Sequence, residues 1–555
     1  MISNLFAEQK QNNLLFHNIL RWGTMREASA ISPTSAPSND TKVTTTTLEH
    51  VSVKIVKAFV QSDGSHGNGA GVVILETGNS SRSRANEKTD GLNQFFPSDE
   101  TCIAIAKQVG LPETSFVLIL KDYDKLSDRQ SAYGSNMAAD FHVKWYTPEC
   151  EIDMCGHATI ALAGYVYSIV EAKYKTDGYV NSNSGTSQPN PISWRMQCKA
   201  GLLGIDVFDG VQTGNARCNS SYMKKNDSNT RSSDETIKLS RIVMEQARPI
   251  FCGIIDGDEI ASSLSICAKN DLAIIVEGND SEPHKKDNSE KSSFLFPFPH
   301  CEIVSTGGRD LMVPIRSTVL KQMNIFGRKE LCDNINTVSK KYDIVGYHMY
   351  EVDDDFFRND IQSEVVNRAN VEIQRSTQDV HLNDLIRIFQ LAKKMGCSGS
   401  KKSLKAVMQE YEPPPDQKID EDVKRNHNVR NTSTTKPAYA RISRIIHVTG
   451  IRNFAPYVGI PEEPATGSAN GALACYLVKH LFLEACCCDK LLNKPMTFRF
   501  CMEQGRVMGE PCLIDAEIEV LNGVIASVKV GGLVNVTKDC LDLDMTSMRQ
   551  NIRAT

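Results

Sequence analysis

One ten-residue pattern occurs twice in this chain, and it constrains the possible folds more than any other feature. GHATIALAGY begins at Gly156 and GSANGALACY begins at Gly467, and six of the ten aligned positions are identical. Small residues recur at helical spacing in both segments, which is typical of a helix packed closely against a sheet on most sides. Taken alone, the repeat indicates similar packing of two buried helices.

The residues at the two predicted helix starts add a chemical feature. Gly156 is followed by His157, and Gly467 is followed by Ser468. The first backbone N–H groups of an α-helix have no partner within the helix, and the helix dipole favours negative charge beside them. Two such starts facing one another would line a cleft between two domains with hydrogen-bond donors. We therefore expect a site for a carboxylate or an oxyanion there.

Runs rich in Val, Ile and aromatic residues predict strands around both helices. They cover 51–60, 70–75, 114–120, 140–147, 202–208, 272–277, 342–352, 497–503, 515–520 and 524–530. Two further helices are predicted, one over 383–395 and one that begins at Ser98 or Asp99 and stops near Gly110. The expected fold class is α+β, with two pseudo-symmetric, strand-rich halves each wrapped round a central helix.

The domain organisation follows from these elements and from composition. We expect a disordered extension over residues 1–47, a first half over 48–190 completed by 536–548, and a second half over 191–535 with a large insertion at about 353–440. Polar segments have the composition of long disordered surface insertions; they are 78–93, 176–191, 214–236, 278–293 and 412–437.

Composition excludes several classes of function. The formal net charge of −5 gives no electrostatic footprint for nucleic acid or an anionic membrane, and no run of 18 apolar residues predicts a membrane span. The 17 cysteines form no CxxC pair, which favours a reducing, cytoplasmic location; N-terminal targeting to an organelle stays open. The run Cys486-Cys487-Cys488 lacks the spacing of a zinc site. Because P-loop and Rossmann patterns are also missing, we expect neither a metal nor another cofactor.

Four separated segments form an ordered series of motifs. They are KAFVQSDGSHGNGAGVVIL (57–75), FPSDETCIAIAKQVGLPETSFVL (96–118), FHVKWYTPECEIDMCGHATIALAGYV (141–166) and RNFAPYVGIPEEPATGSANGALACYL (452–477), the last followed by QGRVMGEP (504–511). Together with STGGRDLMVPI (305–315), this series resembles the phenazine-biosynthesis PhzF-like proteins. The resemblance implies their diaminopimelate epimerase-like fold of two pseudo-symmetric halves.

The resemblance also implies roles for individual side chains. Glu113 matches the family's proton-transferring glutamate, and His157 matches the histidine at the substrate. By residue type alone, a glutamate before a strand is usually a surface charge. A histidine at a helix start is often a cap or a core residue. The motifs favour catalytic roles for both.

In the second half, the family motif supplies an aspartate and a serine. Ser468 is present, but Glu463 occupies the aspartate position with one methylene more, and a misplacement of about an ångström can cost about 10²-fold in rate. Glu510 stands where the family has Arg, and Gly69 where it has Pro. The catalytic set that we expect is Glu113, His157, Glu463 and Ser468, with Gly156, Thr466, Gly467, Ala469, Thr306 and Gly307 at the substrate.

Cys155 matches the first of the two cysteines with which diaminopimelate epimerases work. The position of the second thiol is Pro464 here, so epimerisation by two cysteines is disfavoured. Cys155 is then either a small buried hydrophobe or a lone thiol in the cleft.

The function that we expect is that of a PhzF-like isomerase, a homodimer that moves a proton and a double bond within a small carboxylic acid. Glu113 would be the shuttle, with no nucleic-acid or membrane partner. One alternative is an epimerase or racemase acting on an amino or hydroxy acid. The other is a non-catalytic scaffold that retains the fold and uses the 353–440 insertion to bind partners.

Overall fold

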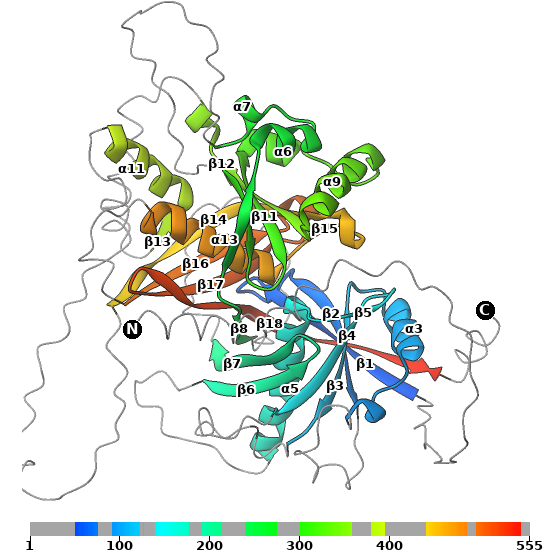
Figure 1. Ribbon diagram of the computed structural model, residues 1–555. Helices are drawn as coiled ribbons and strands as arrows, with labels where there is room; N and C mark the ends of the chain where they lie inside the picture. The colour runs from blue at the N-terminus through cyan, green and yellow to red at the C-terminus, as the bar shows by residue number, and fades with distance from the viewer. Residues whose placement is uncertain are drawn as a thin grey trace, which may run out of the picture.

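In the computed structural model of the protein, the last strand, β18 (Val524–Asp544), passes through both halves of the molecule (Figure 1). The structure describes residues 50–75, 92–121, 126, 139–176, 191–211, 239–274, 300–357, 379–394, 440–484 and 495–545. The expected extension 1–47 and nearly all of the predicted polar insertions lie outside these residues.

In the first half, strands form a closed ring around one helix. The ring runs β1–β2–β3–β4–β6–β7–β8–β18 and returns to β1. Its elements are β1 (His50–Val60), β2 (Asn68–Leu75), α3 (Asp99–Val109), β3 (Thr114–Ile119), β4 (Phe141–Tyr146), β5 (Glu151–Ile152), α5 (Gly156–Thr176), β6 (Ile192–Cys198), β7 (Gly201–Val211) and β8 (Leu239–Gln246). Helix α5 contacts β1, β2, β8 and β18. Its Ala158, Ala161 and Ala163 are fully buried, and such small side chains allow close packing.

The ring shows that the boundary between the halves lies further along the chain than expected. β6 pairs with β4, and β8 pairs with β18 beside α5, so the chain from 191 to 246 lies in the first half rather than the second. The polar stretch before residue 191 therefore separates two parts of one half. Residues 533–544 of β18 pair with β1 and complete the ring.

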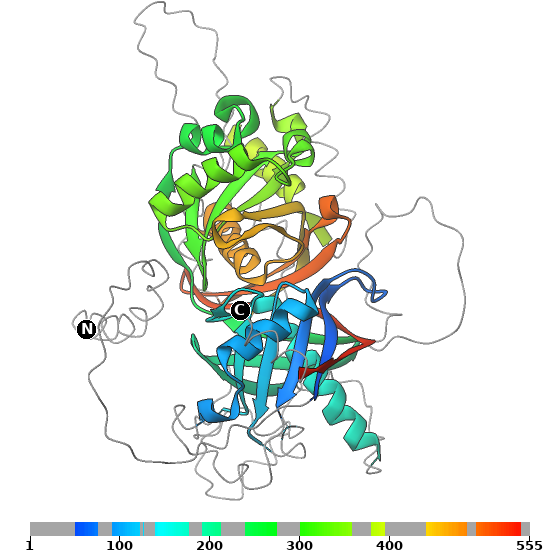
Figure 2. The same cartoon turned by 90° about the vertical axis from the view of Figure 1, so that its right-hand side faces the viewer.

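The second half surrounds α13 (Gly467–Val478), in which every residue except Ser468 is buried. Paired neighbours run in the order β9–β10–β11–β12–β14–β16–β17–β18, and β14 joins β16 through its first part and β12 through its last. The strands are β9 (Ile250–Ile255), β10 (Cys301–Ser305), β11 (Arg309–Arg316), β12 (Gly346–Val352), β13 (Asp379–His381), β14 (Ala440–Ala455), β15 (Ile460–Glu463), β16 (Met496–Gln504) and β17 (Cys512–Leu521). The two halves lie one above the other in both views (Figures 1 and 2), and the expected α+β fold class is confirmed.

Outer helices cover the second half. α6 (Gly257–Leu264), α7 (Ala268–Asp271), α8 (Ser317–Gln322) and α9 (Lys329–Tyr342) pack with the strands β10, β11 and β12 in one apolar cluster. α11 (Leu382–Lys394) confirms the helix predicted at 383–395. Among the described residues, no helix is long and apolar enough to span a bilayer.

Most strand predictions hold, but the one at 272–277 is wrong over the residues that are described. α7 ends at Asp271, and Leu272 makes only an isolated bridge to Ile315. Leu272 and Ile274 are buried in the apolar cluster, which explains their hydrophobicity without a strand. Ser98 caps α3 with its side chain, as predicted.

Candidate active site

The starts of the two repeated helices meet at the junction of the halves. A Cβ atom placed on Gly156 would lie 3.8 Å from the Cα atom of Gly467 and 3.9 Å from the backbone nitrogen of Ser468. The two helix dipoles thus direct their positive ends toward one place, as the repeat predicted. Ser468 is the one partly exposed residue of α13.

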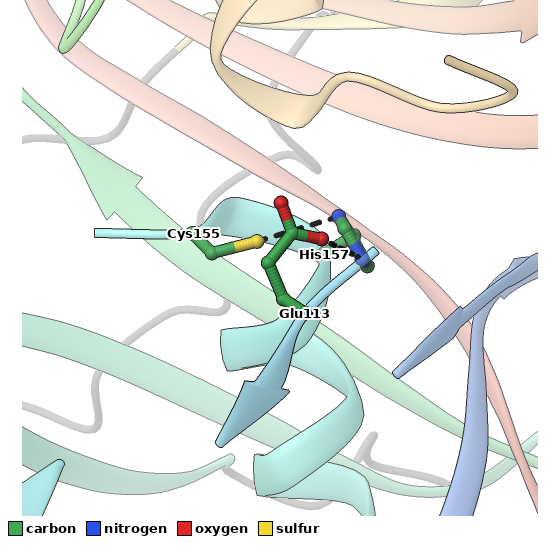
Figure 3. A group of neighbouring side chains, drawn as sticks. All are labelled: Glu113, Cys155 and His157. Atoms are coloured by element: carbon green, nitrogen blue, oxygen red, sulfur yellow. Dashed lines mark hydrogen bonds and ion pairs between the residues drawn. The ribbon is translucent and has the colours of Figure 1, made fainter. Parts of the chain in front are cut away.

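Glu113 and His157 form a buried acid–base pair beside these helix starts (Figure 3). Glu113 precedes β3, and His157 is the second residue of α5. The Oε2 atom of Glu113 lies 3.1 Å from the Nε2 atom of His157, and the side chains are 6% and 2% exposed. Neither atom has a well-aligned hydrogen bond within the described residues. A bound substrate could therefore contact both.

Glu463 approaches the same imidazole from the other half. Its Oε1 atom lies 3.2 Å from the Nδ1 atom of His157. The histidine of the first half thus stands between two carboxylates, one from each half. Despite its extra methylene, Glu463 thus lies in direct contact with the histidine.

These neighbours determine the protonation of His157. Burial lowers the pKa of this imidazole, but Cys155 and Glu113 raise it by more, so the pKa lies well above its usual value. Burial likewise raises the pKa of the Cys155 thiol, to about 11. The raised pKa favours the protonated form of His157.

A buried amide holds the loop that carries Glu463. Gln504, fully buried at the end of β16, donates to the backbone oxygen of Glu463 at 2.8 Å and to the Thr466 hydroxyl at 3.1 Å. It accepts from the backbone nitrogen of Thr466 at 3.1 Å and from the side chain of Asn470 at 2.7 Å. The Thr466 hydroxyl in turn donates to Glu463 Oε2 at 2.7 Å. Thr466 thus orients the carboxylate instead of presenting a free hydroxyl.

The Glu463 carboxylate also receives a bond from the first half. Asn68, at the start of β2, donates to Glu463 Oε1 at 3.1 Å and to the backbone oxygen of Ala465 at 3.2 Å. The halves are therefore joined by hydrogen bonds at this carboxylate as well as by the contact with His157.

The other expected substrate-binding residues lie close by, with different environments. Thr306 is buried and donates to Gln246 at 2.9 Å and to the backbone oxygen of Ser468 at 3.0 Å, so it supports the start of α13. Gly307 is exposed and faces Met154 of the first half, while Ala469 is fully buried. Of the two helix-start glycines, Gly156 is half-buried and Gly467 is buried.

Asp310 is a buried acid near the site that sequence reasoning did not single out. It is 2% exposed, and burial, with the nearby Glu463 charge, raises its pKa to about 7. It lies in the STGGRDLMVPI segment, so the motif contained a signal. Asn68, Gln246 and Gln504 were missed too, because amide residues carry no periodic pattern.

Two departures from the family motif lie at the edge of the site. Glu510 pairs with His66 at 3.4 Å, both side chains being 47% and 40% exposed respectively. This pair links the loop after β16 to the loop before β2. Gly69 lies within β2 and forms a regular strand pair with Lys57 of β1.

Cys155 is buried, and it is not an isolated core residue. Its Sγ atom lies 3.4 Å from His157 Nδ1, and ligand atoms of Glu113, Cys155 and His157 all lie within 4.8 Å of one another. The sequence predicted no metal-ligating set, because these residues have none of the usual spacing. Cys155 approaches the imidazole at Nδ1 and Glu113 approaches it at Nε2.

Two strand-rich halves, each around a central helix, with the helix starts meeting at the junction, make up a diaminopimelate epimerase-like fold. The family model for phenazine biosynthesis-like proteins matches residues 56–207 and 403–538, more than half of the chain. The protein belongs to that family.

Several known proteins resemble the chain over different lengths. An uncharacterized isomerase of Clostridium acetobutylicum is 24% identical over 431 residues, which are 77% of this chain and 83% of that protein. The phenazine biosynthesis-like domain-containing protein 2 of Mus musculus is 35% identical over 63 residues, 11% of this chain and 19% of that protein. The crystal structure of a PhzF-family phenazine biosynthesis protein of Bacillus anthracis aligns over 89% of this chain and 99% of its own, with 15% identity and a TM-score of 0.42. The family match supports an enzyme of the isomerase or epimerase type.

Proposed function

We propose that the protein is a cofactor-independent isomerase that moves a proton, and with it a double bond, within a small carboxylic acid. One observation carries the proposal: the buried Glu113 carboxylate lies 3.1 Å from His157 where the starts of α5 and α13 meet. A general base, an acid and an anion-binding set of N–H groups are then within reach of one small molecule.

Each group has a distinct task in this proposal. Glu113 takes a proton from an activated carbon and returns it to another carbon on the same face of the substrate. The imidazolium of His157 donates to the oxygen on which negative charge develops. The N–H groups at Gly156, Gly467 and Ser468 hold the carboxylate of the substrate.

Exclusion of water supports the same chemistry. Glu113 and His157 are almost fully buried, and contacts between the halves at Glu463 close the junction. Substrate entry then requires the halves to separate, and their closure completes the set of acid–base groups.

A second candidate is an epimerase or racemase. The observation that favours it is the placement of Glu113 and Glu463 on opposite nitrogens of His157, one carboxylate from each half. Two acid–base groups on opposite faces of a carbon would invert its configuration. The reaction product distinguishes the two candidates, since an isomerase shifts unsaturation and an epimerase does not.

The test is a screen of small carboxylic acids against wild type, Glu113→Gln and, as a matched control, Glu100→Gln on the exposed start of α3. Ligands that raise the melting temperature are followed by proton NMR in heavy water. We expect wild type and Glu100→Gln to exchange or shift substrate protons, and Glu113→Gln to lose at least about 10²-fold in rate.

Binding without exchange in all three proteins would contradict the proposal and favour a scaffold. The scaffold hypothesis makes a further prediction in cells, where deletion of 353–440 should remove the function and Glu113→Gln should not. Homodimerisation and a cytoplasmic location also stay predictions, to be checked by sedimentation and by localisation of the tagged chain.

A further inference from the structure

Two glutamates stand next to one another in β15, and they bind different partners. Glu463 lies 3.2 Å from the Nδ1 atom of His157, whereas the carboxylate of Glu462 binds Arg452. Successive residues of a strand point to opposite faces. Because the two side chains carry the same chemical group, a shift of β15 by one residue would bring Glu462 to the site in place of Glu463.

The backbone pairing of β15 gives little resistance to such a shift. This strand has four residues, and it pairs with β14 at Asn453–Glu463 and at Ala455–Ile460. Three steps along β15 therefore correspond to two steps along β14. The extra residue of such a bulge is left unpaired and interrupts the regular ladder. Two pairs around an unpaired residue specify the register of β15 weakly.

Arg452 adds a side-chain constraint on the register. Its Nε and Nη2 atoms donate to the two carboxylate oxygens of Glu462 at 2.8 and 2.7 Å, which is the bidentate geometry of a strong pair. Its Nη1 atom donates to the backbone oxygens of Leu320 and Met323 at the end of α8, at 2.8 and 2.6 Å. The guanidinium also lies 4.8 Å from the centre of the Phe454 ring.

Burial makes this pair selective between the two glutamates. The side chains of Arg452 and Glu462 are 3% and 1% exposed. A slip that brought Glu462 to His157 would place Pro461 where Glu462 now stands, and a proline side chain cannot accept the two bonds. The buried guanidinium would then keep an uncompensated charge, which is strongly destabilising. The ion pair therefore penalises the wrong register.

We propose that Arg452 is a positioning residue for the acid–base site. By binding Glu462 on the face of β15 that meets α8, it commits Glu463 to the opposite face and so to His157. Arg452 acts through the strand and not by contact with the substrate. Its importance for catalysis rests on the proposed function, whereas its effect on the geometry at His157 can be measured without a substrate.

The test is a double-mutant cycle read at the His157 imidazole, by NMR of the full-length protein with isotope-labelled histidine. The chain has 12 histidines, and the signal of His157 is the one that His157→Gln lacks. A neighbouring carboxylate raises the pKa of an imidazole, so Glu463→Gln should lower the pKa of His157 in the wild-type background. In an Arg452→Met, Glu462→Met background, the same change should lower this pKa by less than half as much.

This background removes both charges of the buried pair together, so neither is left without its partner. The matched control is an Arg387→Met, Asp353→Met background, which removes the 2.6 Å ion pair that Arg387 of α11 forms. There, Glu463→Gln should keep its full effect on His157. An equally large effect in the Arg452→Met, Glu462→Met background would overturn the proposal. So would the lack of any effect in the wild-type background, since Glu463 would then not stand beside His157.

A second variant covers the case in which the methionine pair shows no cooperative thermal transition. Arg452→Lys keeps the positive charge but lacks the planar fork that binds both oxygens of Glu462. In this background too, the effect of Glu463→Gln should shrink, and an unchanged effect overturns the proposal. Because the cycle needs no substrate, absence of turnover in the screen of carboxylic acids would contradict the proposed function and leave the role of Arg452 standing.

Discussion

The buried carboxyl of Asp310 stands out among the titratable residues around the junction. It lies opposite Gly346 in the ladder of β11 and β12, and its pKa is raised to about 7 by burial and by Glu463. The acid is therefore largely protonated in the folded protein below neutral pH. In the unfolded chain the same carboxyl ionises near its ordinary pKa. Ionisation of Asp310 in the folded protein therefore lowers the stability of the fold.

We predict that Asp310→Asn makes stability less dependent on pH. The pKa of Asp310 is higher in the folded than in the unfolded state, so the protonated carboxyl contributes fully to the free energy of unfolding below about pH 4. This contribution is lost as the pH rises through 7, and each unit of pKa difference corresponds to about 1.4 kcal/mol. Asparagine cannot ionise, so the variant should gain free energy of unfolding relative to wild type between pH 5 and pH 8. Urea unfolding of both proteins at pH 5 and at pH 8 measures this difference in free energy.

The exposed Asp542→Asn on β18 is the control for this prediction, since it makes the same chemical change away from the junction. If the free energies of unfolding of Asp310→Asn and Asp542→Asn change equally between the two pH values, then ionisation of Asp310 does not destabilise the fold.

The residues of the junction differ in how far sequence could identify them. The motif order placed Glu113, His157 and Glu463 in one predicted site, and the structure brings these three side chains together. The hydrogen bonds of Gln246 and Gln504 could not be predicted. Gln246 bonds to a residue 221 positions away along the chain and Gln504 to one 41 positions away, and no local pattern records such pairs.

At the scale of elements, both central helices pack against the one strand β18 through a glycine. A Cβ atom on Gly164 of α5 would lie 2.5 Å from Cγ1 of Val534, and one on Gly471 of α13 would lie 2.9 Å from Cγ2 of Val530. The two glycines occupy different positions of the ten-residue repeat. The two helices therefore contact β18 through different positions of the repeat.

We predict that Gly164→Ala destabilises the protein by about 1–3 kcal/mol, because the added methyl group meets the stiff, β-branched side chain of Val534. Val534→Ala in the same protein should recover part of the loss. Chemical denaturation of both single variants and the double variant gives the coupling between the two sites. Purely additive losses would show that the helix–strand contact is not the cause.

The elements also show which patterns sequence can and cannot resolve. The glycine starts of α5 and α13 and the capped α3 were predicted, because caps and small-residue periodicity are local signals. β6 and β8 were missed, and the chain around them was given to the wrong half. Their pairing with β4 and β18 depends on ring closure, which is a property of the whole half.

At the scale of the whole molecule, β18 joins the hydrogen-bond ladders of the two halves. It pairs with β17 of the second half through residues 524–531, and with β8 and β1 of the first half through residues 528–544. Neither half can lose β18 without breaking the ladder of its neighbour. The contacts of Glu463 with His157 and Asn68 add to this connection.

We therefore predict that the two halves unfold in one cooperative transition. The chain has three tryptophans, and Trp145 and Trp194 are buried in the first half. In a Trp22→Phe background the fluorescence therefore reports on that half, whereas far-UV circular dichroism reports on both. The two thermal transitions should coincide. Fluorescence that changes at a lower temperature than circular dichroism would show that the first half unfolds alone.

The path of β18 has a consequence for synthesis of the chain on the ribosome. The ring of the first half begins with residue 50, but it closes only when residues 533–544 have paired with β1. Translation delivers that strand last, after the whole second half has emerged. Until then, the amino-terminal half carries an open β1 edge and an incompletely covered central helix. During most of its production, the nascent protein therefore presents an unpaired strand edge of the kind that chaperones protect.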